Sequence, residues 1–97
     1  MNRFIVVYWQ QEAYRHIHCQ TRQEANEWLE AVFIREGGKP MGIYDAKTEL
    51  FHWEPARQQV YDQLGIDEQG RLGHHIIAIA QAFFSQLSPV TAVQLHT

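Results

Sequence analysis

The sequence has few of the features that assign a chain to a class at once. Cys19 is the only cysteine among 97 residues, so no disulfide can form within the chain, and we expect a reducing compartment. No apolar run approaches the roughly 20 residues that a membrane-spanning helix requires. The opening MNRFIVVYWQQE has too short an apolar stretch for a secretory signal. We therefore expect a cytoplasmic protein with no membrane segment.

Basic residues are also too few and too scattered to indicate a nucleic-acid partner. The chain has 8 Lys and Arg against 11 Asp and Glu, with a formal net charge of -3, and its basic residues form no run. This balance gives no general attraction for phosphate backbones or anionic lipid. We therefore expect neither nucleic acid nor a membrane surface as a partner.

What the chain does have is the composition of one folded domain. Hydrophobic residues make up 45% of it and charged residues 20%, which is the balance of a globular chain. A chain of 97 residues is too short for two cores. We assign residues 1–87 to a single domain and residues 88–97 to a C-terminal tail, extended or disordered. The tail SPVTAVQLHT is β-branched and has no charged side chain, so it could add to a strand edge.

Runs of β-branched and aromatic residues predict two β-hairpins. RFIVVYW at residues 3–9 and YRHIHCQ at residues 14–20 are separated by a short polar loop and form the first hairpin. MGIYD at residues 41–45 and ELFHWE at residues 49–54 form the second. The connection DAKT begins with Asp45, whose side chain can bond the backbone of a type I turn.

A capping box marks the start of the first helix. In TRQE, residues 21–24, the Thr21 hydroxyl can accept from the amide of Glu24, whose carboxylate reaches back to the amide of Thr21. The helix ends at the glycine pair 37–38, since glycine adopts the left-handed conformation of a C-terminal cap. The apolar stripe that should face the core consists of Ala25, Trp28, Leu29, Val32 and Phe33.

Two further helices follow the second hairpin. EPARQQVYDQLG at residues 54–65 has Pro55 at a plausible first position and ends at a glycine. Residues 66–71 are predicted as a loop and residues 72–87 as the last helix, which SP at 88–89 ends. The order predicts an α+β domain: a four-stranded, mainly antiparallel sheet in ββαββα(α) order, with the helices packed on one face.

The sheet face that this arrangement leaves uncovered is the candidate binding surface. Side chains alternate along a strand, so Tyr14, His16 and His18 share that face, with His52 and Tyr44 expected beside them from the second hairpin. Two imidazoles two residues apart lie roughly 6.5–7 Å from each other at the backbone, within chelating reach. The chain has no cysteine pair and no metal-ligand spacing motif, so we expect no metal and no cofactor.

No residue carries a catalytic motif. Cys19 should face the core as a small hydrophobe, and Ser85 and Ser88 lack a nucleophile-elbow context. We therefore do not expect an enzyme. The sequence favours a small non-enzymatic protein-interaction or regulatory module that self-associates as a homodimer, through the predicted surface or through the tail. The alternative is a small-ligand or metal-binding protein that uses the same histidine- and tyrosine-rich surface.

Overall fold

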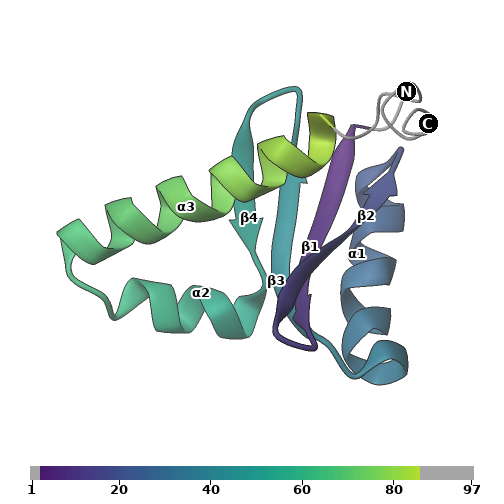
Figure 1. Ribbon diagram of the computed structural model, residues 1–97, viewed down its shortest axis with the longest axis horizontal. Helices are drawn as coiled ribbons and strands as arrows, with labels where there is room; N and C mark the ends of the chain where they lie inside the picture. Colours follow the sequence, from purple (N-terminus) through teal and green to yellow (C-terminus); the bar gives the residue numbers. More distant parts are fainter. Residues whose placement is uncertain (1–2, 86–97) are drawn as a thin grey trace.

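The computed structural model describes residues 3–85 as a small α+β domain built around one sheet (Figure 1). The four strands are antiparallel and lie in the order β2-β1-β3-β4, which confirms the predicted fold class. The predicted tail, residues 88–97, lies outside the described residues. The elements are β1 (Phe4–Gln10), β2 (Ala13–Cys19), α1 (Arg22–Ala31), the π-helical turn η1 (Val32–Glu36), β3 (Lys39–Asp45), β4 (Leu50–Trp53), α2 (Pro55–Asp62) and α3 (Ile66–Ser85).

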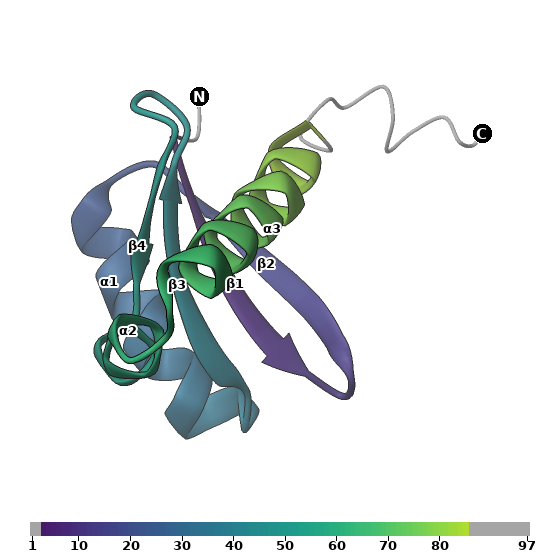
Figure 2. The ribbon, with the colours of Figure 1, turned by 90° about the vertical axis from the view of Figure 1, so that its left-hand side faces the viewer.

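The helices cover both faces of the sheet, so the prediction that they pack on one face was wrong. Figure 2 shows α1 on one side of the strands and α3 on the other. The reason lies in β1, where Phe4, Ile5, Val6 and Val7 are all buried. Because successive side chains of a strand point to opposite faces, a strand that is apolar at every position needs a cover on each side.

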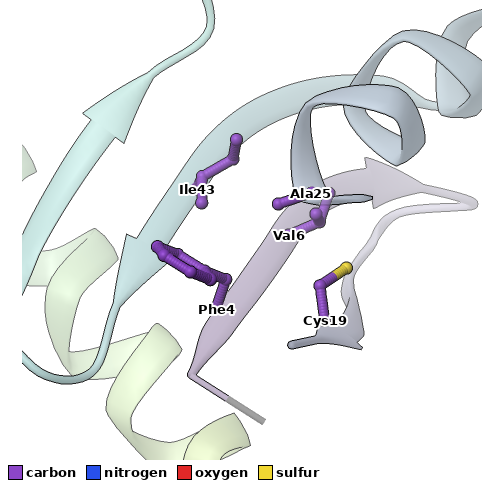
Figure 3. Packing of buried hydrophobic residues seen from close by; sticks show 5 residues of the cluster. All are labelled: Phe4, Val6, Cys19, Ala25 and Ile43. Atoms are coloured by element: carbon purple, nitrogen blue, oxygen red, sulfur yellow. The ribbon is translucent and has the colours of Figure 1, made fainter. Parts of the chain in front are cut away.

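Two hydrophobic clusters result, one under each helix. Under α1, Phe4 and Val6 of β1 meet Ile43 of β3, Cys19 of β2 and Ala25 of the helix (Figure 3). On the other face, Ile5, Val7 and Tyr44 pack against Ile76 and Ala80 of α3. The sheet is thus the middle of three layers, and its central strands supply the core of both clusters.

Local hydrogen bonds confirm the predicted start and end of the first helix. The amide of Glu24 donates to Thr21 Oγ1 at 3.1 Å, and the Glu24 carboxylate accepts from the amide of Gln20 at 2.9 Å, one residue before the expected amide. Gly37 ends the helical segment with a φ of 68°, in the left-handed region that glycine enters without steric cost.

The last part of this helical segment is a π-helical turn, and it changes which residues reach the core. Val32 is fully buried, whereas Phe33 is 70% exposed and Ile34 is 78% exposed. A π-turn is wider than an α-turn because its hydrogen bonds span five residues. The stripe that includes Ala25 therefore does not continue to Phe33, and the prediction that Phe33 faces the core was wrong.

The second hairpin turn is held by Asp45, as predicted. Asp45 Oδ1 accepts from the amide of Lys47 at 2.9 Å, and the Asp45 carbonyl accepts from the amide of Glu49 at 2.7 Å. Arg3 also donates two side-chain hydrogen bonds of 2.7 Å to the Asp45 carboxylate. These Arg3 hydrogen bonds hold the pKa of Asp45 far below its usual range, so the carboxylate remains charged and joins the turn to the start of β1.

The helix α3 begins at Ile66, so the predicted loop at residues 66–71 is helical. Asp67 and Glu68 lie in its first turn, where negative charge is favourable beside the free amides of a helix start. The Tyr61 hydroxyl of α2 donates to the Gln69 carbonyl at 3.1 Å, and the Gln69 side-chain amide donates to the Tyr61 carbonyl at 3.0 Å. These contacts hold the first turns of α3 against α2.

No helix within residues 3–85 is both long enough and apolar enough to cross a bilayer.

Candidate functional site

The structure divides the residues of the predicted binding surface between the two sheet faces. Those residues are Tyr14, His16, His18, Tyr44 and His52. The first four lie on the side of α3. His52 is paired across the strands with Ile43, whose side chain packs under α1, and directly opposed residues of a pair point to the same side. The five residues therefore do not form one surface.

The face on which four of them lie is covered by α3, not open as predicted. The His16 ring stacks on Phe83, with ring centroids 4.1 Å apart and planes inclined by 18°. Tyr44 is only 2% exposed, and its hydroxyl accepts a hydrogen bond of 3.3 Å from Gln81. Both side chains thus contribute to the packing of α3 on the sheet.

The two neighbouring histidines are held in conditions that favour their neutral forms. The centroids of the His16 and His18 rings are 4.7 Å apart, edge to face. Burial lowers the pKa of His16, and the nearby His18 lowers it further. Burial also lowers the pKa of His18, whose buried Nδ1 meets no hydrogen-bond partner within residues 3–85. In the same range no three His, Cys, Asp or Glu side chains converge as metal ligands would.

Cys19 faces the core under α1, as predicted, and is fully buried. Burial, with a smaller contribution from the negative charge of Glu24, raises the pKa of its thiol to about 11. A thiol that stays protonated at neutral pH is a poor nucleophile. Its position therefore suits packing and not covalent chemistry.

A groove at one end of the sheet was not predicted from the sequence. It lies where β1 ends, where β3 and α2 begin, and beside the end of η1, the lower end of the sheet in Figure 1. We call it the end groove; its volume is about 610 Å³. Its lining residues are Trp9, Gln10, Gln11, Phe33, Gly37, Gly38, Lys39, Pro40, Glu54, Ala56 and Arg57.

The end groove combines exposed aromatic side chains with charges of both signs. Trp9 is 38% exposed and Phe33 is 70% exposed, and both line it together with Lys39 and Arg57. The Glu54 carboxylate caps α2 and accepts from the amides of Ala56 and Arg57 at 3.0 and 3.2 Å. The groove can therefore bind an apolar side chain while its rim pairs with polar or charged groups.

A sequence signal for the end groove does exist in the three consecutive apolar residues VFI at 32–34. Successive residues of an α-helix are about 100° apart around its axis, so three in a row cover about 200° and cannot all face one sheet. In the structure Val32 faces the sheet and Phe33 points away from it. Phe33, which points away from the core, lines the end groove.

Comparisons of the chain with protein-family models, with curated proteins and with solved structures found no match. What the protein binds must therefore be inferred from its own surface.

Proposed function

We propose that the protein is a small non-enzymatic interaction module of the cytoplasm that self-associates through the end groove. The observation that carries the proposal is the 70% exposure of Phe33 in the lining of a largely apolar hollow. Apolar side chains grouped next to a concave surface are typical of interaction sites. A reducing compartment agrees with the single cysteine, Cys19, which is free and buried.

A second copy of the chain suits this surface because the surface is self-complementary. Phe33 protrudes at the rim of the same groove that could receive an aromatic ring. Lys39 and Glu54 supply opposite charges to the same lining. A two-fold axis brings one patch against its copy, so each protrusion faces a hollow and each charge can face its opposite.

The magnitudes favour a dimer that dissociates readily. Full burial of a side chain such as Phe33 contributes about 1.5–3 kcal/mol, and two copies supply two Phe33 rings and two partly exposed Trp9 rings at the groove. Association costs an opposing 4–15 kcal/mol or so in lost freedom of motion. Because the two contributions are similar in size, we expect a concentration-dependent equilibrium and not a permanent dimer.

Binding of a small ligand or a metal at the histidines, the alternative from the sequence, has less support. Tyr44 is buried and His16 is stacked under α3, while His52 lies on the other face. Too few of these side chains converge to surround a ligand.

Sedimentation of the full chain over a wide range of concentration tests the proposal. The wild-type protein should pass from monomer to dimer, whereas Phe33→Ser should remain monomeric with an unchanged fold by circular dichroism. Ile66→Ser is the matched control, because Ile66 is 85% exposed but lies at the start of α3, away from the groove (Figure 1). This control should dimerise like wild type. A wild-type protein that is monomeric throughout, or a Phe33→Ser variant that dimerises normally, would overturn the proposal.

A further inference from the structure

Two histidines of β2 form the contact between this edge strand and the last turns of α3. The His16 ring stacks on Phe83, with ring centroids 4.1 Å apart. The His18 ring meets the His16 ring edge to face at 4.7 Å, and both side chains are partly buried. The packing of the end of α3 on β2 therefore depends on two side chains that can gain a charge near neutral pH.

The sheet offers these two rings no negative charge. Their partners across the strand pair are Val7 for His16 and Ile5 for His18, and both are fully buried and apolar. Arg15, the charged residue of β2, lies between the histidines and points to the opposite face. Among residues 3–85 no carboxylate forms an ion pair with either ring.

The helix that covers the rings carries no compensating charge either. Residues 72–85 contain no Asp, Glu, Lys or Arg, and their only titratable side chains are His74 and His75. His75 lies edge to face with the Tyr14 ring at 6.2 Å, farther along the same face. A second cation on α3 would thus add to the positive charge of a protonated pair.

A proton bound by the pair would have no partner on this face. The buried Nδ1 of His18 has no hydrogen-bond partner within residues 3–85, so a proton on it would be a buried donor without an acceptor, which is costly. A proton on His16 as well would place two positive charges on rings 4.7 Å apart. The end of a helix favours a nearby cation, but the unpartnered Nδ1 shows that no α3 carbonyl reaches it.

We propose that protonation of His16 and His18 releases the second half of α3, from Ile76 to Ser85, from the sheet. The first turns of α3 should stay in place, because the two hydrogen bonds between Tyr61 and Gln69 hold them to α2. Release would uncover the apolar sheet residues that Ile76 and Ala80 now cover, namely Ile5, Val7 and Tyr44. The histidine pair is thus a pH-sensitive contact that controls exposure of this face.

The direction and size of the effect follow from proton binding. The closed form favours neutral rings, whereas in the released form each ring should have the ordinary pKa of 6.5. The released form therefore binds more protons, and the closed form loses stability as the pH falls through 6.5. Between pH 7.5 and pH 5.5 the ratio of released to closed form should rise up to about tenfold for each histidine and about a hundredfold for both.

Amide hydrogen exchange of the full chain at pH 7.5 and pH 5.5, corrected for the intrinsic rates, tests the release. A short helical segment without packing does not persist in water, so the amides of Ala80, Phe83 and Phe84 should lose protection by about ten- to a hundredfold at the lower pH. The amides of Trp28 and Leu29 in α1, on the other face, should lose much less. Magnetisation transfer between the His16 and Phe83 rings should weaken over the same range.

Glutamine variants identify the groups responsible. His16→Gln and His18→Gln should each reduce the loss of protection in α3 to about tenfold, and the double variant should abolish it. His52→Gln is the matched control, because His52 is exposed and lies on the α1 face, and it should respond like wild type.

Phe33→Ser should also respond like wild type, which separates this proposal from dimerisation at the end groove. Protection of the α3 amides that is unchanged at pH 5.5 would overturn the proposal. So would an equal loss in α1 and α3, which would indicate unfolding of the whole domain, or a wild-type response of the double glutamine variant.

Discussion

Replacing Val32 with alanine should destabilise the domain much more than replacing Phe33, although phenylalanine is the larger side chain. Val32 is fully buried, and Phe33 is 70% exposed. Val32 and Tyr8 both lie close to Gly38, because a Cβ atom added at Gly38 would lie 3.0 Å from a side-chain carbon of each. The environment at Val32 is thus closely packed, whereas most of the Phe33 ring is already in water.

The expected losses follow from these exposures. Val32→Ala removes two buried methyl groups, worth about 0.8 kcal/mol each, and leaves a cavity that adds to the cost, so we expect about 2–3 kcal/mol in total. Phe33→Ala removes a ring with little buried area, and exposed substitutions usually change stability by about 0.5 kcal/mol. For a domain of this size each kcal/mol shifts Tm by about 4–8 °C, so the difference is easy to measure.

Urea denaturation of both variants, followed by circular dichroism, gives the comparison. The measurements belong at a concentration where the wild type is monomeric, because Phe33 also lies in the proposed dimer surface. Equal m-values would show that the two variants unfold by the same transition. A loss of about 3–5 kcal/mol for Phe33→Ala, the cost typical of a core phenylalanine, with a small loss for Val32→Ala, would refute the π-helical turn.

Three further predictions concern a strand, a turn and the histidines. Gly42→Ala should cost about 3 kcal/mol, because the added Cβ would lie 2.3 Å from the His52 carbonyl oxygen; an unchanged Tm would contradict this close approach. Glu12→Gly should stabilise the protein by about 0.5–1 kcal/mol. Glu12 has a φ of 62°, in the left-handed region that glycine adopts at lower steric cost than glutamate. A urea midpoint at or below that of the wild type would count against this prediction. The free energy of unfolding should fall as the pH drops below 6.5, the ordinary pKa of histidine. The pKa values of His16 and His18 are lowered in the folded protein, so below this pH the unfolded chain binds more protons than the folded chain does. Thermal melts of the double glutamine variant should show a weaker pH dependence in this range, and an identical slope would exclude these two side chains as its source.

The sequence alone determined the features whose interactions are local. The Thr21 cap, the Asp45 turn and the glycine that ends the first helical segment each depend on hydrogen bonds or backbone angles within a few residues. Strand periodicity likewise showed that Tyr14 and His16 share a side. Signals of this kind can be recognised in sequence because every atom that decides them is close along the chain.

Only the tertiary structure decided which layer covers each face and which side chains meet. The side of His52 depends on its pairing with Ile43, and the cover over His16 depends on Phe83, far along the chain. Alternation shows which residues of a strand lie together, but it does not show which helix lies over them. The end groove has the same origin, because the outward turn of Phe33 matters only once β1, β3 and α2 converge beside it. Such arrangements depend on contacts between distant segments, and those contacts exist only after the chain has folded.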